Sequence, residues 1–301
     1  MSERSLLEEL KRRPLLCDGA MGTQLMMRGL SPGECGEMWN VNQAAIVEGI
    51  HRAYRNAGCD LITTNTFGGS AFALQRHGLG HRTGELNRAG ARAAVGVAEG
   101  GAFVLGDMGP FGGFLEPVGE TTQEELEDIF EEQAAALAEG GCDALIVETM
   151  SDAAELAVAV QAAKSVGKRP VIATYAFSRG ENDSYRTMMG VGVKDAIGRA
   201  IGAGADVVGA NCGSGLSLGD YVRLAEQLVA AAGGTPVILQ PNAGKPAMVD
   251  GRLMYAAKPG DMAALVASLL KAGVRIIGGC CGTTPEHLQA MAEAMKSDAG
   301  Q

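Results

Sequence analysis

The stretch VRIIGGCCGTTP, residues 274–285, joins a short apolar run to glycines and a pair of adjacent cysteines. Other short apolar runs along the chain also end in glycine or polar residues, and stretches of helical periodicity lie between them. Uninterrupted apolar character, without the alternation of a half-exposed strand, is typical of parallel strands covered on both faces. The strands predicted on this basis are residues 14–17, 60–64, 102–106, 143–147, 170–175, 206–210, 236–240 and 274–277.

Eight strand–helix units in succession predict an α/β fold, the (β/α)₈ TIM barrel. An open doubly wound sheet is the alternative. At 301 residues the chain is long for one domain, but barrels of this kind often run to about 250 residues or more. No linker, charge block or low-complexity segment divides the chain. Residues 1–301 are therefore predicted to form a single domain, with a short extra helix in residues 1–13.

The charge and the cysteine content limit the class of protein. A formal net charge of -10 argues against direct binding to nucleic acids or anionic membranes, because both are polyanions. The sequence has no apolar stretch of the roughly 18 residues that a membrane span needs. The charged N-terminal segment does not resemble a secretory signal. Seven cysteines, an odd number, fit a reducing cytoplasm better than a disulfide framework.

Three cysteines suggest a metal site. Cys280 and Cys281 follow the last predicted strand, and Cys212 follows the strand at residues 206–210. Three thiols at strand ends predict a zinc centre with one open coordination position. A buried core thiol or a redox-active pair is the alternative reading. The other cysteines are expected in the core or in loops, and His51, His77, His81 and His287 are expected to face solvent rather than a metal.

Polar residues collect at the carboxyl ends of the predicted strands, which meet at one mouth in a parallel barrel and form its active site. Zinc held by three thiolates carries a charge of about -1, so it is a poor Lewis acid for activating water. It is better suited to keeping a fourth thiol as a thiolate near neutral pH, since a free thiol has a pKa of about 8.5. This chemistry favours S-alkylation of a thiol substrate over hydrolysis.

The sequence resembles the homocysteine S-methyltransferase family, and is most similar to the homocysteine-binding module of cobalamin-dependent methionine synthases. The resemblance extends from about residue 14 to 295, and the paired-cysteine motif is its most specific part. It implies a zinc-dependent (β/α)₈ barrel that binds L-homocysteine through sulfur and methylates it to methionine. The motifs are, in order, DGAMGT, TTNTFGGS, GDMGP, VETMSD, GANCG, QPNAGKP and GGCCGTTPEH.

The same resemblance implies roles for individual residues. Cys212, Cys280 and Cys281 would be the zinc ligands and the catalytic centre. Glu148 would bind the substrate ammonium, and Asp18 with the backbone N–H groups of Gly19 and Ala20 would hold the amino-acid end. The remaining residues expected to line the pocket are Thr66, Phe67 and Asn242. Asp107 lies at the same level, with no role assigned.

The methyl donor is a separate question. Relatives that use betaine need aromatic faces for its quaternary ammonium, and they have a tyrosine after the strand-four glutamate, where this chain has Thr149. The chain also ends before folate- or cobalamin-binding modules would begin. Methylcobalamin on a separate corrinoid protein is therefore the predicted donor, and S-methylmethionine or betaine is the alternative. An alternative function, from a different functional class, is a zinc-bearing subunit that binds a thiol without turnover of its own.

Overall fold

The computed structural model describes residues 5–99, 101–249 and 252–299. Its main sheet has eight parallel strands in the order β1-β12-β9-β8-β5-β4-β3-β2. A parallel bridge between Cys17 and Leu61 joins β1 to β2, and the Asp60 N–H donates to the Leu16 carbonyl at 2.7 Å. The sheet therefore closes on itself, which confirms the predicted barrel and excludes the open sheet. The strands are β1 (Leu15–Leu16), β2 (Leu61–Thr63), β3 (Phe103–Met108), β4 (Ala144–Met150), β5 (Val171–Tyr175), β8 (Val207–Asn211), β9 (Val237–Gln240) and β12 (Ile276–Ile277).

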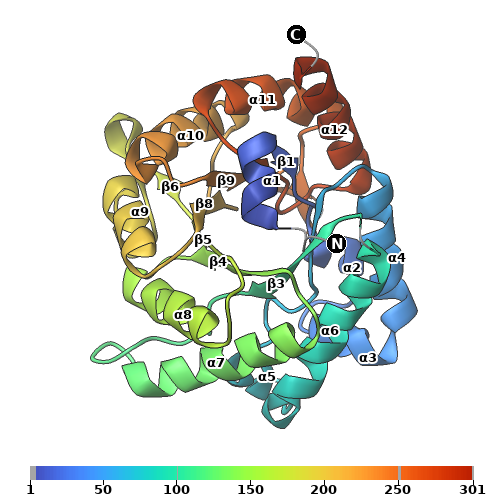
Figure 1. Ribbon diagram of the computed structural model, residues 1–301, viewed down its shortest axis with the longest axis vertical. Helices are drawn as coiled ribbons and strands as arrows, with labels where there is room; N and C mark the ends of the chain where they lie inside the picture. The colour runs from blue at the N-terminus through green and yellow to red at the C-terminus, as the bar shows by residue number, and fades with distance from the viewer. Residues whose placement is uncertain (1–4, 100, 250–251, 300–301) are drawn as a thin grey trace.

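Each barrel strand is followed by a helix on the outside, and these helices pack side by side into a ring (Figure 1). A capping box forms at the start of α7 (Gln123–Glu139), where the Thr122 side chain accepts from the Glu125 N–H and the Glu125 side chain accepts from the Thr122 N–H. Asp152 caps α8. The ring is α4 (Ala44–Asn56), α6 (Thr83–Ala98), α7 (Gln123–Glu139), α8 (Ala153–Ser165), α9 (Val193–Gly202), α10 (Leu218–Ala232), α11 (Pro259–Ala272) and α12 (Pro285–Ala299).

Short elements fill the segments between strand ends and outer helices, at the mouth of the barrel. The β6–β7 hairpin follows β5, and the β10–β11 hairpin follows β9. No helix among the residues described is long and apolar enough to cross a membrane. The short elements are α2 (Met21–Met27), η1 (Gly36–Met38), α3 (Trp39–Asn42), α5 (Ala71–Gln75), η2 (Gly80–Arg82), β6 (Ser178–Arg179), η3 (Glu181–Asp183), β7 (Tyr185–Arg186), β10 (Pro246–Val249) and β11 (Arg252–Tyr255).

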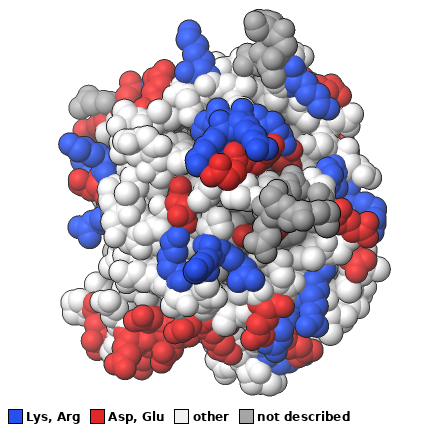
Figure 2. Space-filling view, viewed as in Figure 1, with Lys and Arg blue, Asp and Glu red and all other residues white. Residues whose placement is uncertain are grey.

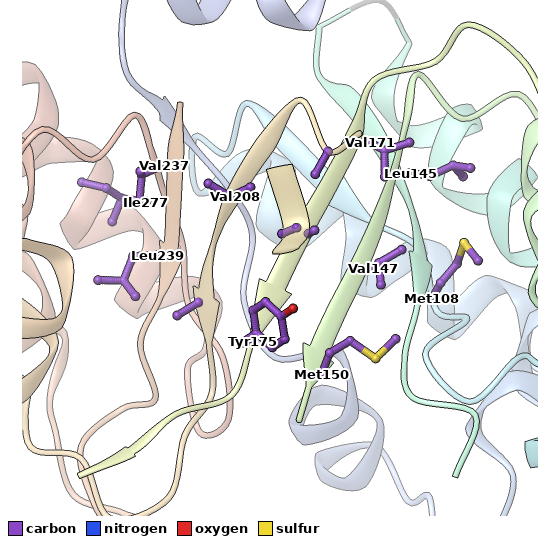
Figure 3. Close-up of a cluster of buried hydrophobic side chains, with 14 of the residues drawn as sticks. Met108, Leu145, Val147, Met150, Val171, Tyr175, Val208, Val237, Leu239 and Ile277 are labelled. Carbon is purple, nitrogen blue, oxygen red and sulfur yellow. The ribbon is translucent and has the colours of Figure 1, made fainter. Parts of the chain in front are cut away.

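The apolar core has two layers, because successive strand residues point to opposite faces of the sheet. In β4, Leu145 and Val147 belong to the outer layer between sheet and helices, whereas Ala144 and Ile146 point into the barrel. Figure 3 shows the outer layer, in which Leu145, Val147 and Met150 lie beside side chains of β3 and β5. The two layers explain the uninterrupted apolar runs of the sequence.

The predicted extra helix is α1 (Leu6–Arg12), which lies across the amino-terminal end of the barrel (Figure 1). Leu6 and Leu10 are buried in the same cluster as the inward-pointing strand residues. The Arg275 guanidinium donates to the Leu10 carbonyl, and Arg13 pairs with Asp60 at 2.8 Å. This helix closes the end of the barrel opposite the mouth.

Charge is unevenly distributed over the molecule. Figure 2 shows the face that carries α1, where basic and acidic side chains alternate near the helix and acidic ones gather along the lower left edge, near α7. Helix α7 contains seven Asp and Glu residues and no Lys or Arg between Gln123 and Glu139. The excess of negative charge is thus concentrated partly on one outer helix.

Candidate active site

Above the apolar layers, the inward-pointing positions near the carboxyl ends of the strands become polar. The hydroxyl of Thr174, on β5, donates to Asn211 Oδ1, on β8, at 2.8 Å. Side chains from strands far apart in the chain therefore meet inside the mouth of the barrel. The polar residues of this level are Thr63, Asp107, Glu148, Thr174, Asn211 and Gln240.

The three cysteines of the predicted zinc centre come together at one side of the mouth. Cys212 Sγ lies 3.8 Å from Cys281 Sγ, and Cys280 Sγ lies 4.0 Å from Cys281 Sγ. Two sulfurs that bind one zinc ion at about 2.3 Å in tetrahedral geometry are about 3.8 Å apart, whereas a disulfide is much shorter. All three are free thiols. Their spacing and their sulfur donors fit a zinc ion, and three protein ligands leave one position for another group.

Backbone hydrogen bonds hold the cysteine segments in place. Cys212 has a left-handed φ of 55°, and its carbonyl accepts from the Tyr221 hydroxyl at 2.7 Å. The Cys280 N–H donates to the Pro241 carbonyl at 2.8 Å, and the Cys281 carbonyl accepts from the Ala243 N–H at 3.0 Å. The end of β9 therefore ties the paired cysteines to the segment that carries Cys212.

The thiols differ in acidity because they hydrogen-bond to one another. Hydrogen bonds from Cys212 and Cys280 hold the pKa of Cys281 well below its usual range, while the bond with Cys212 raises the pKa of Cys280. Cys281 is therefore the most acidic of the three thiols, and the other two hold their protons more tightly. Because metal ligation requires thiolates, a divalent cation at this site would displace those protons.

Asp18 is buried and already has hydrogen-bond donors. The Thr63 N–H donates to its Oδ2 and the Thr63 hydroxyl to its Oδ1, each at 2.8 Å. Burial nevertheless raises the pKa of Asp18 to about 7. The Ala20 N–H donates to the Thr283 hydroxyl at 3.2 Å, and a Cβ added at Gly19 would lie 2.6 Å from the same oxygen. The segment is thus packed against the last βα loop, and its contact with substrate stays a prediction.

Glu148 lies at the inner end of the mouth, near the sulfurs. Its Oε2 accepts from Asn211 Nδ2 at 3.2 Å. Burial raises the pKa of Glu148 to about 8, and the negative charges of Asp18 and Cys281 add to the effect. A carboxyl group in such surroundings gains stability as a carboxylate only when a cation joins it.

The other predicted pocket residues have different surroundings. The Thr66 hydroxyl is buried and donates to the Asp107 carbonyl at 2.8 Å. Phe67 is 42% exposed, and its ring lies over Gly109. Asn242 Nδ2 donates to the Gly213 carbonyl at 3.1 Å, while its Oδ1 is buried and has no partner among the residues that the structure describes. Asn242 and Phe67 thus have groups left for a ligand, whereas the Thr66 hydroxyl is engaged with the backbone.

A family model for homocysteine S-methyltransferase matches residues 15–295. The chain belongs to the homocysteine S-methyltransferase family. This membership confirms the resemblance found in the sequence and the predicted enzyme class.

Two curated relatives of this family member are methionine synthases from mycobacteria. The protein from Mycobacterium leprae is 32% identical over 313 residues, and that from Mycobacterium tuberculosis is 32% identical over 311 residues. The alignments cover 97% of this chain but 25% of each relative. The chain therefore spans about a quarter of the length of the methionine synthases it matches.

Solved structures of the homocysteine methyltransferase MmuM from Escherichia coli share the fold. The metallated form matches with a TM-score of 0.79 at 20% identity, over 96% of this chain and 98% of the other. The oxidized form matches with a TM-score of 0.78 at 21% identity, over the same shares. At such identities the likeness shows the shared barrel fold.

Asn211 is a residue of this candidate site that sequence reasoning missed. Its Oδ1 accepts from the Thr149 N–H at 2.8 Å, and its Nδ2 donates to the Thr149 hydroxyl at 2.7 Å. Thr149 has a left-handed φ of 62°, which these bonds stabilise. Because Nδ2 also reaches Glu148, Asn211 positions the end of β4. Its place at the last, inward-pointing residue of β8, just before Cys212, is the signal that could have identified it.

Tyr255, at the end of β11, is a second missed residue of the site. Its side chain lies over Gly282, where a Cβ would overlap the ring, and Gly282 has a φ of +79°. The phenol hydrogen-bonds to Cys281 and helps to lower the pKa of that thiol. No sequence pattern connects this hairpin residue to the cysteine pair, because the contact depends on how the β10–β11 hairpin folds back.

Two of the four histidines contradict the expectation of solvent exposure. His51 on α4 is fully buried, and its two ring nitrogens have no partner among the described residues. His287 is 8% exposed, and its Nε2 lies 3.0 Å from the Ala257 carbonyl. Both lie on helix faces that pack inward, which helical periodicity alone did not reveal. His77 and His81 are exposed, as expected.

Proposed function

We propose that this chain binds zinc through Cys212, Cys280 and Cys281, holds L-homocysteine with its sulfur at the remaining position, and methylates it to methionine. The observation that carries the proposal is the closeness of three thiols to a half-buried carboxyl group, that of Glu148, in one barrel mouth. Sulfur donors suit the thiol end of homocysteine, and the carboxyl group suits its ammonium.

The sulfur end of the site supports thiol activation. Zinc bound there would keep a substrate thiol deprotonated near neutral pH. Around the sulfurs, Asn211 Nδ2 lies 3.9 Å from Cys280 Sγ, and Tyr255 donates to Cys281. Such donors partly neutralise the negative charge that several thiolates bring together, and they orient the sulfurs.

The amino-acid end of homocysteine would be held by Glu148 and by the segment from Asp18 to Ala20. The substrate ammonium would contact Glu148, whose Oε2 accepts from Asn211 Nδ2 at 3.2 Å. The substrate carboxylate would reach the N–H groups of Gly19 and Ala20, and in doing so would replace the 3.2 Å bond between Ala20 and Thr283. Phe67 and Asn242 would line the remaining space.

The surface around the mouth supports a macromolecular methyl donor, which we propose to be methylcobalamin on a separate corrinoid protein. Exposed apolar side chains are common on the segments that follow the strand ends, and such side chains favour protein contacts. Among these exposed side chains are Met26, Met27, Phe67, Phe114, Val118, Met188, Met189, Met248 and Met254.

In the transfer step, the homocysteine thiolate would form a bond to the methyl carbon. The bond between the methyl group and the donor would break and leave its electron pair on the donor.

A small cationic donor has less support. Betaine recognition calls for aromatic faces near the reacting sulfur. Here Thr149 follows Glu148, and its hydroxyl accepts from Asn211 at 2.7 Å.

Because the site needs reduced thiols, a cytoplasmic location is proposed as well.

A donor panel tests the proposal. The zinc-loaded protein is incubated with homocysteine and, separately, with methylcobalamin, S-methylmethionine and betaine, and methionine is measured. We expect methionine from methylcobalamin alone, no product from Cys212→Ser, and unchanged product from Cys35→Ser as the control. Product from S-methylmethionine alone would refute the corrinoid donor. Homocysteine-dependent proton release without product from any donor would favour the thiol-binding subunit.

A further inference from the structure

Asp107, near the end of β3, points into the barrel beside β4, the strand that carries Glu148. Along β3, Leu105 belongs to the inner apolar cluster and Met108 to the outer one, so the alternation turns the Asp107 side chain inward. The residue is 4% exposed. On β4, one of the two strands beside β3, Ile146 lies opposite Asp107, and Glu148 follows two residues further on.

The backbone of Asp107 is firmly held, but its carboxyl group is not. The Asp107 N–H donates to the Thr64 hydroxyl at 2.9 Å, and its carbonyl accepts from Thr66 at 2.8 Å and from Gln133 at 3.3 Å. Within the described part of the chain, Oδ1 is buried and has no hydrogen-bond partner. A buried acceptor without a donor costs about 1–3 kcal/mol, so a group that supplies a donor there is strongly favoured.

Other aspartates of the barrel show what a structural role looks like in this fold. Asp143 accepts from the Val104 N–H at 2.7 Å, and Asp206 accepts from the Val171 N–H at 2.8 Å. Each of them satisfies the backbone of a neighbouring strand. Within the described ranges, Oδ1 of Asp107 satisfies no backbone N–H of a neighbouring strand, so a role in holding the strands together does not explain it.

The charges around Asp107 are all of one sign. Burial raises the pKa of Asp107 well above its usual value, and the negative charges of Glu148, Asp18 and Glu37 raise it further. Clustered carboxyl groups repel one another as carboxylates until a cation is added. An ammonium group has three N–H donors, enough to satisfy two carboxylates together.

We infer that Asp107 shares the substrate ammonium with Glu148, so that the two carboxylates select thiols that carry an α-amino group. The inference rests on the proposed function and adds a specificity determinant to it. Asp107 contacts the ammonium through its side chain while Thr64, Thr66 and Gln133 keep its backbone in place.

The test compares two thiols in the zinc-loaded protein, homocysteine and 4-mercaptobutanoate, which lacks the amine but keeps the thiol and the carboxylate. Dissociation constants are measured for the wild type, Asp107→Asn and the exposed control Asp128→Asn. We expect Asp107→Asn to bind homocysteine about 10-fold to 100-fold more weakly, the usual range for a charge-assisted hydrogen bond. Its affinity for 4-mercaptobutanoate should change less than about 3-fold, and Asp128→Asn should match the wild type.

The ratio of the two affinities within one variant does not depend on the fraction of protein that is folded. An unchanged ratio in Asp107→Asn would overturn the inference and leave the proposed function standing. A wild type that binds neither thiol would overturn both. Thermal unfolding of Asp107→Asn gives a second measurement. Because the substitution removes an unsatisfied carboxyl group, the melting temperature should rise. A lower melting temperature would assign Asp107 a structural role instead.

Discussion

Cys212 Sγ lies 3.8 Å from Cys281 Sγ although the two residues are 69 positions apart in the chain. They follow β8 and β12, which are separated in the sheet by β9. Because parallel strands end at the same edge, the barrel brings both thiols to its mouth without any contact between their own strands. The metal-binding proposal depends on this relationship.

Removal of one sulfur should abolish tight zinc binding. Cys281→Ser leaves two thiols, and we expect zinc affinity to fall by more than about 100-fold. Removal of a group that only hydrogen-bonds to a metal ligand already lowers metal affinity by about 10–100-fold, and loss of the ligand itself should lower it further. Competition with a chromogenic chelator measures the affinity, and elemental analysis gives the stoichiometry. Cys35→Ser, outside the triad, is the control and should keep one zinc per chain. Full zinc occupancy in both Cys281→Ser and Cys212→Ser would disprove the site.

Asn211 should position Glu148 rather than act on the substrate. Asn211→Ala leaves the Thr149 N–H without its 2.8 Å acceptor, so we expect a loss of about 1–3 kcal/mol in unfolding free energy and a higher KM for homocysteine. Asn211→Asp keeps the acceptor but places a second carboxylate beside Glu148, so it should regain part of the stability and still bind homocysteine weakly. Chemical denaturation and steady-state kinetics measure the two effects. Equal stability of the two variants would contradict this role.

Stability in acid should depend on His51. Burial lowers the pKa of His51 from its usual 6.5 to about 4. Between these values the unfolded chain binds the proton more readily, so the unfolding free energy falls as the pH drops from about 6.5 to 4, by up to roughly 3 kcal/mol. His51→Leu should remove this part of the pH dependence in denaturation curves at successive pH values. His77→Gln, at an exposed position, should retain it.

Gly209 on β8 should not tolerate a methyl group. A Cβ at this position would overlap the carbonyl oxygen of Ile238 on the neighbouring strand β9. We expect Gly209→Ala to lose about 3 kcal/mol or more of unfolding free energy, because the backbone cannot move aside within a closed sheet. Gly198→Ala on α9 is the control, since nothing lies within 4 Å of its added Cβ. It should gain up to about 1 kcal/mol from better helix propensity, and thermal melting would show both changes.

The fold was accessible from local sequence patterns. The predicted strand at residues 274–277 contains β12 (Ile276–Ile277), and the strand at 143–147 overlaps β4 (Ala144–Met150). Both are short apolar runs beside capped helices, and such local preferences survive in the tertiary structure. The predicted solvent exposure of His51 was wrong, because the spacing of residues along a helix does not show how closely each helix face is packed.

What the sequence alone determined was the barrel, the family, and the position of three thiols and one glutamate at strand ends. Apolar runs, caps and turn residues act over a few neighbours along the chain, so they can be read there. What only the tertiary structure decided was which side chains have partners. Asn211 meets Glu148, Tyr255 meets Cys281, and Oδ1 of Asp107 has no donor among the described residues. Those contacts arise from closure of the sheet and from folding of the hairpin, which bring together residues that no local pattern relates.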